Sequence, residues 1–220
     1  TSFGKDGVDV CFAADELKGS GKGFDLLYVD LDGQGNLAKG KRLTGKPAVR
    51  SSSFKDTEFK PFKVEIPGFG DYTVQARLAI KREALSKGAP GDSTLYLTAL
   101  MAMEGAVEFD GQKQRLVVFD ANCNGIFGEK GSPRRGAGTA SGDKIWIGSG
   151  SPKLDQAFTE ALPIGRYYCF EGVWYELSFP SSSNVEIQKA EVALGKLAVN
   201  NPGFLLELAD GHEILIAANP

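Results

Sequence analysis

The sequence is poor in the side chains that most zinc sites and catalytic triads use. Its 220 residues include one histidine, His212, and three cysteines, with no Cys-x-x-Cys pair. Because structural zinc is usually held by four cysteine or histidine ligands, this composition excludes a zinc site of the ordinary kind. A serine triad would have to recruit the single histidine, and no Gly-x-Ser-x-Gly elbow is present. No catalytic residue is therefore identified from the sequence.

The chain also lacks a long apolar segment and a large excess of charge of either sign. No apolar run approaches the about 18 residues of a transmembrane helix, so no membrane span is predicted. The 25 Lys+Arg and 28 Asp+Glu residues give a formal net charge of −3, which does not favour nucleic-acid binding. With 42% hydrophobic and 24% charged residues, the composition is that of a globular protein.

The clearest periodicity in the sequence has a period of two. In one segment, apolar residues at every second position alternate with mostly polar ones, as in a half-buried strand: Tyr72, Val74, Ala76, Leu78 and Ile80. Similar segments recur, and two-residue pairs ending in glycine join several of them, at 110–111, 171–172 and 210–211. Because glycine accepts the positive φ of a type I′ turn, these pairs predict hairpins. The predicted fold is all-β, an antiparallel β-sandwich built from sequential hairpins.

The sequence leaves open whether the chain forms one domain or two. A stretch rich in Gly, Ser and Pro at 86–93 favours an N-terminal β unit at 1–88 and a C-terminal β unit at 89–220. A weak internal repeat supports two related units, since VDLDGQGNLA aligns with FDANCNGIFG ninety positions later. One continuous β-sandwich over 1–220 is the alternative. Short helices are predicted at 81–88 and 152–162, the second with Ser151 as its cap.

The second copy of the repeat carries a motif with chemical content. The oxygen-bearing residues Asp120, Asn122 and Asn124 alternate, and Gly125 follows them. Three oxygens at alternate positions can curl round a hard cation, a glycine at the sixth position allows the bend, and the seventh residue offers its carbonyl. The spacing resembles the Asp-x-Asn-x-Asn-Gly start of the calcium loops of EF-hands and dockerins. This resemblance implies three side-chain ligands and a backbone ligand at Ile126.

The first copy of the repeat has the same pattern with poorer ligands: Asp30, Asp32, Gln34 and Gly35. Neither copy has the glutamate of the EF-hand at the twelfth position, where Gly131 and Lys41 stand instead. Candidates for the missing carboxylate of the second copy are Glu129 and Asp143. Both copies can also be metal-free turns, because Asp and Asn side chains hydrogen-bond their own backbone. If the second copy binds calcium, its single certain carboxylate predicts the weak affinity of extracellular modules.

The turn-rich strands and the two loops together resemble uncharacterised secreted bacterial β-proteins that carry such calcium loops. The resemblance to calcium loops covers about eight residues of the chain, at the second copy, and no activity is implied. The turn chemistry and the weak calcium spacing predict a secreted, periplasmic or cell-envelope location.

One predicted hairpin, RYYCFEGVWYELSF at 166–179, concentrates aromatic residues. Because alternate residues of a strand face opposite sides, its rings cannot all lie on one core face. Exposed rings on a β surface can stack on sugars or anchor a partner protein, so the candidate ligand-binding residues are Tyr168, Trp174 and Tyr175. A core hairpin with a single ring at its edge is the other interpretation.

Two of the three cysteines lie in predicted strands. Cys11 and Cys169 lie in apolar segments and are interpreted as small core residues, with a disulfide between them as the alternative.

The expected function is that of a non-catalytic secreted or cell-envelope β-protein with a glycan or protein ligand, or with a purely structural role. The alternative is a carbohydrate-active enzyme whose two carboxylates face each other across a cleft. The oligomeric state is not predicted.

Overall fold

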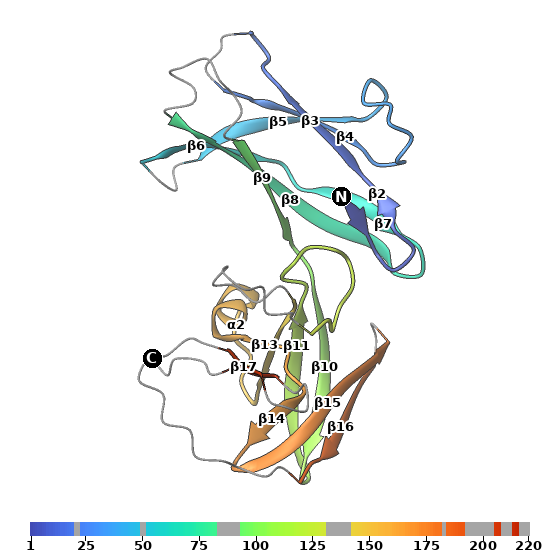
Figure 1. The fold of residues 1–220 in the computed structure, drawn as a ribbon, viewed down its shortest axis with the longest axis vertical. Coiled ribbons are helices and arrows are strands. Elements are labelled where there is room, and N and C mark those ends of the chain that lie inside the picture. The colour runs from blue at the N-terminus through green and yellow to red at the C-terminus, as the bar shows by residue number, and fades with distance from the viewer. Residues whose placement is uncertain are drawn as a thin grey trace. The chain divides into compact units, whose positions relative to one another are not determined.

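The protein is built from antiparallel β-sheets, so the predicted all-β class is confirmed (Figure 1). The computed structural model describes residues 1–19, 23–48, 52–82, 93–130, 142–181, 184–191, 205–207 and 213–215. The helix that lies wholly within these ranges is α2 (Leu154–Glu160), and no helix in them is long and apolar enough to cross a membrane. The chain forms two compact units, Thr1–Ala102 with Asp120–Ile126 and Met103–Phe119 with Phe127–Pro220.

The first unit contains a meandering antiparallel sheet. Its neighbouring strands are, in order, β3 (Cys11–Asp15), β4 (Leu26–Asp30), β5 (Lys41–Ala48), β6 (Phe54–Phe59), β8 (Gly70–Lys81) and β9 (Ser93–Ala99). A small hairpin of β1 (Ser2–Phe3) and β2 (Val8–Asp9) precedes this sheet. The first unit therefore extends beyond residue 88, because β9 is hydrogen-bonded to β8.

The strand β7 (Phe62–Ile66) continues β6 along the same edge of β8. Val74 of β8 pairs with both Phe62 of β7 and Ala99 of β9, so β7 and β9 lie on opposite edges of β8. The strand β6 also pairs with β8 opposite β9. Glu58 and Phe62 are four positions apart, whereas their partners on β8, Arg77 and Val74, are three positions apart. This extra residue makes a β-bulge at the link between β6 and β7.

The core of the first unit lies on one face of this sheet. The alternating apolar residues predicted for β8 are all buried there: Tyr72, Val74, Ala76, Leu78 and Ile80. The ring of Tyr72 packs against the ring of Phe3 on β1, with centroids 5.7 Å apart. The polar residues between them, including Gln75 and Arg77, lie on the opposite face and are half-buried. The period of two in the sequence therefore placed the core face of β8 correctly.

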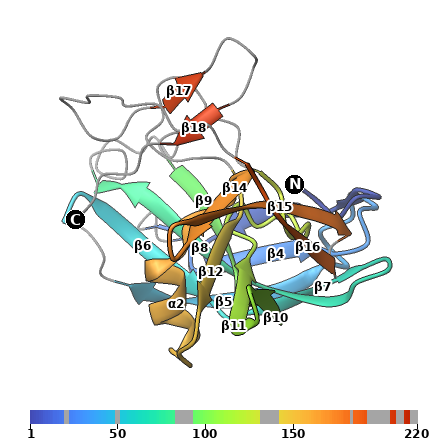
Figure 2. The same ribbon diagram turned by 90° about the horizontal axis from the view of Figure 1, so that it is seen from below.

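The second unit contains two main sheets. One joins β10 (Ala102–Phe109), β11 (Gln112–Phe119), β12 (Lys144–Gly148) and β13 (Leu162–Pro163), and α2 lies beside β12 (Figure 2). The other joins β14 (Tyr167–Phe170), β15 (Val173–Ser181) and β16 (Asn184–Lys189). A short pair is formed by β17 (Leu205–Glu207) and β18 (Glu213–Leu215). The ring of Phe109 on β10 stacks on Phe170 of β14 at 4.7 Å, so the two main sheets pack face to face.

Two of the predicted tight turns are confirmed. Asp110 and Gly111 have φ of 45° and 83°, and Glu171 and Gly172 have φ of 47° and 82°. Positive φ at both central residues is what a type I′ turn requires. The third predicted turn, at 210–211, lies outside the described residues.

The helix predicted at 152–162 forms, but its start differs from the prediction. The helix α2 begins after Lys153, with no side-chain cap, so the expected cap at Ser151 is wrong. Lys153 has an extended backbone and takes the N-cap position, and the carbonyl of Pro152 before it accepts a hydrogen bond of 3.2 Å from the Arg115 guanidinium. Beyond Arg82, the other predicted helix lies outside the described residues.

The three cysteines are free thiols. Cys11 and Cys169 are exposed, so the expectation that both are core residues is wrong. Cys11 lies on β3 at the border of its sheet, and Cys169 lies on the face of β14 opposite Phe170, whose ring stacks on Phe109. These positions leave Cys11 and Cys169 exposed, whereas Cys123 is buried.

Candidate functional site

The residues 120–126, here called the Asp120 loop, surround a buried carboxylate. They follow β11 and belong to the first unit. The Asp120 side chain is 4% exposed, and its oxygens accept hydrogen bonds from the N–H of Asn124 at 3.2 Å and of Gly125 at 2.6 Å. The hydroxyl of Tyr72 on β8 donates a further hydrogen bond to the same carboxylate. The loop is therefore tied both to its own backbone and to the sheet of the first unit.

The electrostatics of the Asp120 carboxylate are set by burial. Burial raises its pKa, while the hydrogen bonds from Tyr72 and from the loop backbone act in the opposite direction. No lysine or arginine contributes to this balance within the described part of the chain. Burial and the neighbouring carboxylate raise the pKa of Tyr72 far above its usual range, so the phenol stays neutral and remains a donor. Among the described residues, the Asp120 carboxylate thus has neutral donors around it and no cationic neighbour.

The thiol of Cys123 lies beside this pair, with its Sγ 3.7 Å from the Tyr72 hydroxyl oxygen. Burial raises the pKa of Cys123 to about 12, so the thiol is protonated at neutral pH. Because the thiolate is the nucleophile of cysteine chemistry, this residue is a packing group of the loop.

The two asparagines of the Asp120 loop form the local turns that their residue type favours. The side-chain oxygen of Asn122 accepts the N–H of Asn124 at 3.2 Å, and that of Asn124 accepts the N–H of Ile126 at 2.9 Å. An amide oxygen has two lone pairs, and each of these backbone bonds uses one. The turns therefore fix the orientation of both side-chain oxygens within the loop.

The residues 30–36, here called the Asp30 loop, repeat this arrangement. Asp30 is 1% exposed, and its carboxylate accepts the N–H of Gly35 at 2.6 Å. The carboxylate of Asp32 accepts the N–H of Gln34 at 3.3 Å. A hydrogen bond with the Asp32 carboxyl group, together with backbone N–H groups of the loop, lowers the pKa of Asp30. Two carboxyl groups thus lie within hydrogen-bonding distance of each other.

The two loops share one backbone conformation. Positive φ occurs at the fourth position of each, at Gly33 (65°) and Cys123 (57°), and at the sixth position of each, at Gly35 (72°) and Gly125 (77°). In both loops the first carboxylate accepts the N–H of the sixth residue at 2.6 Å. A positive φ is uncommon for a residue other than glycine, so its presence at Cys123 marks a conformation that the fold imposes. The sequence repeat therefore corresponds to a repeated local structure.

The N-terminal hairpin contacts both loops. The N–H of Gly4, in the turn between β1 and β2, donates to the carbonyl of Asn124 at 2.7 Å. At the other loop, a Cβ on Gly33 would lie 2.8 Å from the Asp9 carbonyl oxygen, so the backbones approach closely there. Both contacts lie within the first unit. Neither this hairpin nor Tyr72 was predicted from the sequence as a partner of the loops. Tyr72 carries the only hydroxyl group among the alternating apolar residues of β8, and this could have indicated a polar partner for it.

The carboxylate candidates from outside the loops have other contacts. Asp143 is fully buried in the second unit, where its carboxylate accepts the N–H groups of Gly128 at 2.8 Å and Glu129 at 3.1 Å. Lys41, the twelfth residue of the first copy, lies on β5, and Gly131 lies outside the described residues. Over the described ranges, no three histidine, cysteine or acidic side chains gather in a way that could hold a metal ion. A cation at either loop would therefore depend on amide and carbonyl oxygens as well as carboxylates.

The structure does not bring the three candidate aromatic residues together on one surface. Tyr175 is 4% exposed, with its ring edge-on to Phe109 at 4.8 Å, and Tyr168 is half-buried and stacks on Phe109 at 5.8 Å. Trp174 is half-buried and pairs with Cys169, so it lies on the opposite face of the hairpin. Two of the three rings therefore belong to the packing between the sheets of the second unit.

Comparison with known proteins gives no relative for this chain. No protein family, curated protein or solved structure matches it.

Proposed function

We propose that this chain is a non-catalytic β-protein of the secreted or cell-envelope class of bacteria, in which two loops bind calcium and the sheets serve a binding or structural role toward a glycan or protein. The observation that carries the calcium proposal is the shared conformation of the Asp30 and Asp120 loops. Both loops have a glycine with positive φ at the sixth position, as the bend of a calcium loop does, and in both the first carboxylate accepts the N–H of that glycine. The repetition of this conformation supports a shared role for the two loops.

The donor set supports calcium over other metals. The ligands would be Asp120, Asn122, Asn124 and the carbonyl of Ile126 in one loop, and Asp30, Asp32 and Gln34 in the other. Calcium accepts amide and carbonyl oxygens readily, whereas zinc and other soft metals favour thiolate and imidazole ligands. The buried Asp120 carboxylate has no cationic neighbour in the part of the chain that the structure describes, so a divalent cation would stabilise it. A divalent cation would also stabilise the adjacent carboxyl groups of Asp30 and Asp32.

The position of the loops supports a stabilising role for the bound ion. The N-terminal hairpin contacts both loops, and Tyr72 connects the Asp120 loop to β8. A ligand that binds only the folded loops raises the free energy of unfolding of the unit that contains them. We therefore expect calcium to stabilise the first unit.

A terbium titration of chelator-treated protein tests this proposal. Terbium occupies calcium sites and luminesces when an aromatic residue nearby is excited, and Tyr72 is such a residue beside the Asp120 loop. We expect luminescence that calcium displaces and that Asp120→Asn removes. The matched control is Asp143→Asn, which changes a buried carboxylate of the second unit that also accepts two backbone N–H groups. Luminescence that Asp120→Asn leaves unchanged, or that calcium does not displace, would contradict the proposal.

A further inference from the structure

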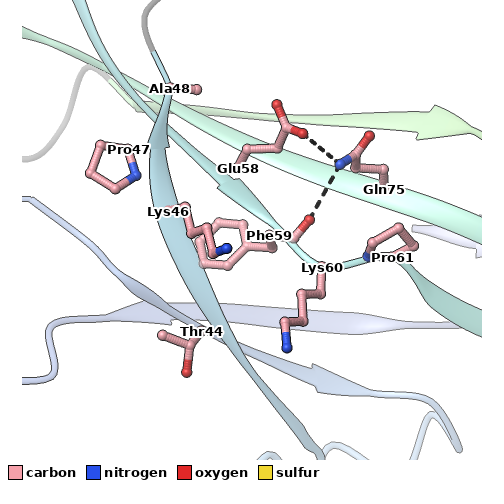
Figure 3. A pocket seen from close by; sticks show the side chains of 9 residues that line it. All are labelled: Thr44, Lys46, Pro47, Ala48, Glu58, Phe59, Lys60, Pro61 and Gln75. Atoms are coloured by element: carbon pink, nitrogen blue, oxygen red, sulfur yellow. Dashed lines mark hydrogen bonds between the residues drawn. The ribbon is translucent and has the colours of Figure 1, made fainter.

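The sheet of the first unit carries two adjoining hollows on the face opposite its core. The larger, about 320 Å³, is bordered by Lys46 on β5, Glu58 on β6, Lys60 at the bulge and Gln75 on β8 (Figure 3). The smaller, about 160 Å³, is lined by Glu58, Gln75, Arg77, Tyr96, Leu97 and Thr98. The two hollows adjoin at Glu58 and Gln75, which line both, and together they are here called the sheet groove.

The strand register explains why these side chains meet in the sheet groove. Lys46 pairs with Glu58, Glu58 pairs with Arg77, and Arg77 pairs with Tyr96. Residues paired across antiparallel strands point to the same face, so these four side chains form a row across β5, β6, β8 and β9. Neighbouring strands lie about 4.8 Å apart, which makes this row about 14 Å long. The row is long enough for several linked ligand groups.

The polar groups of the sheet groove are held in place. The Gln75 amide donates to the Glu58 carboxylate at 2.7 Å and to the Phe59 carbonyl at 3.5 Å, as Figure 3 shows. This orients the amide, and its own carbonyl oxygen has no partner within the described part of the chain. The Arg77 guanidinium is paired with the buried carboxylate of Asp56. Fixed planar groups of this kind bond hydroxyl groups at little cost in side-chain entropy.

The sheet groove also presents an exposed aromatic ring. Tyr96 is 44% exposed, and the guanidinium of Arg77 lies 4.2 Å from its ring centroid. The cation fixes the ring orientation through a cation–π contact. An aromatic ring held in this way offers an apolar surface beside hydroxyl-binding groups, which suits the mixed apolar and polar faces of a sugar ring.

The charge of the sheet groove indicates the sign of its ligand. Lys46 and Lys60 line it with one carboxylate, Glu58, and the charge of Arg77 is balanced by Asp56, although the whole chain has a net charge of −3. Lys46 and Lys60 form no ion pair with any described residue. A local excess of cations on an acidic protein favours an anionic ligand at this position.

We propose that the sheet groove binds an acidic oligosaccharide, with a sugar ring on Tyr96, hydroxyl groups at Gln75 and Glu58, and a sugar carboxylate at Lys46 and Lys60. The proposal rests on the binding role proposed above and is independent of the calcium loops. A peptide is less well suited, because the groove lies on the face of the sheet and is lined by charged and polar groups, whereas peptide recognition by β-proteins uses a free edge or an apolar groove.

Calorimetric titration of the full chain with three probes tests this proposal. The probes are oligogalacturonate, an uncharged glucose oligosaccharide of equal length and oligoglutamate, each used with calcium and with a chelator. We expect oligogalacturonate to bind at least tenfold more tightly than either other probe, and Tyr96→Ala to weaken it about tenfold. The double variant Lys46→Gln with Lys60→Gln should also weaken the binding of oligogalacturonate. Its loss of affinity should be larger at low salt than at high salt, because salt screens the attraction of the lysines for the sugar carboxylates.

Matched controls separate the sheet groove from general effects. Tyr167→Ala removes an exposed ring of the second unit, and Lys63→Gln removes a lysine that pairs with Asp71 outside the groove. Both should leave binding unchanged, and circular dichroism should show every variant folded. If oligoglutamate bound as tightly as oligogalacturonate, the groove would respond to charge alone or bind peptides, and the proposal would be overturned. Equal affinity for the neutral sugar, or no binding of oligogalacturonate, would also overturn it. If oligogalacturonate bound in the titrations with calcium but not in those with chelator, the sheet groove would not be independent of the calcium loops.

Discussion

The hydroxyl of Tyr72 donates a hydrogen bond to the carboxylate of Asp120, across 48 positions of sequence. The donor lies in the core row of β8, and the acceptor begins a loop that follows a strand of the second unit. This bond connects an oxygen-rich loop to the sheet of the first unit. The stability of that unit should therefore respond to changes in the loop.

The first prediction concerns this hydrogen bond. In Tyr72→Phe the buried Asp120 carboxylate loses its side-chain donor, and an unsatisfied buried group usually costs about 1 to 3 kcal/mol. We expect the free energy of unfolding of the first unit, from denaturant melts in chelator, to fall by about this amount. Tyr96→Phe is the matched control on the same sheet, because its ring is exposed, and it should change stability by less than about 0.5 kcal/mol. Equal effects of the two variants would show that the Tyr72 hydroxyl makes no net contribution.

The second prediction concerns pH in the absence of calcium. Burial raises the pKa of Asp120, so the folded protein holds this proton more tightly than the unfolded chain. The stability that results is fully present below the unfolded pKa of about 3.9 and is lost as the pH rises through the folded pKa. The pKa of Asp30 is lowered, so its contribution is present above its unfolded pKa and is lost as the pH falls.

Melting curves in chelator between acidic and neutral pH measure these opposite contributions. Asp120→Asn should remove the loss of stability with rising pH, because its side chain is neutral throughout. Asp30→Asn should remove the loss with falling pH. Two variants with the same pH dependence as the wild type would show that these carboxyl groups do not titrate differently in the folded state.

The third prediction compares the bend glycines of the two loops. Both have positive φ, which disfavours alanine by about 1 to 2 kcal/mol. A Cβ at Gly125 would also lie 2.3 Å from Ile66 Cδ1, whereas nothing lies within 4 Å of a Cβ at Gly35. Crowding of a packed site adds about 1 to 3 kcal/mol. Gly125→Ala should therefore destabilise the first unit clearly more than Gly35→Ala in denaturant melts, and the reverse order would contradict the packing described for the Asp120 loop.

The fourth prediction concerns catalysis. The sheet groove is lined by one carboxylate, Glu58, and glycoside hydrolysis generally uses two. We expect no new reducing ends when the protein is incubated with the acidic or neutral oligosaccharides that test its binding. Reducing ends that Glu58→Gln abolishes would contradict the non-catalytic proposal and would favour the carbohydrate-active enzyme.

The local features of the fold were predictable from the sequence because short-range physics determines them. The alternation along β8 follows from the period of a strand, and the turns at Asp110–Gly111 and Glu171–Gly172 follow from the φ that glycine allows. The repeat of the Asp30 and Asp120 loops is also local, since its hydrogen bonds span five positions or fewer. Each of these features depends on residues within one or two elements.

The features that sequence reasoning missed depend on pairing between distant elements. The bond between Tyr72 and Asp120 requires knowledge of which loop lies beside β8. The sheet groove requires the register of four strands, which places Lys46 and Tyr96 in one row. The hydrogen bond between Arg115 of β11 and the Pro152 carbonyl, just before α2, likewise joins residues 37 positions apart. Periodicity gives the face of a strand, but it does not give its neighbours.

A thermal melt of chelator-treated protein, with and without millimolar calcium, tests the central claim most directly. Calcium at 100 times its Kd should add about 2.7 kcal/mol to the stability of the folded loops and raise the Tm of the first unit by about 5 °C or more. The shift should be smaller in Asp120→Ala and absent when Asp30→Ala is added. A wild-type Tm that calcium does not change would contradict the proposal, and both loops would then be metal-free turns.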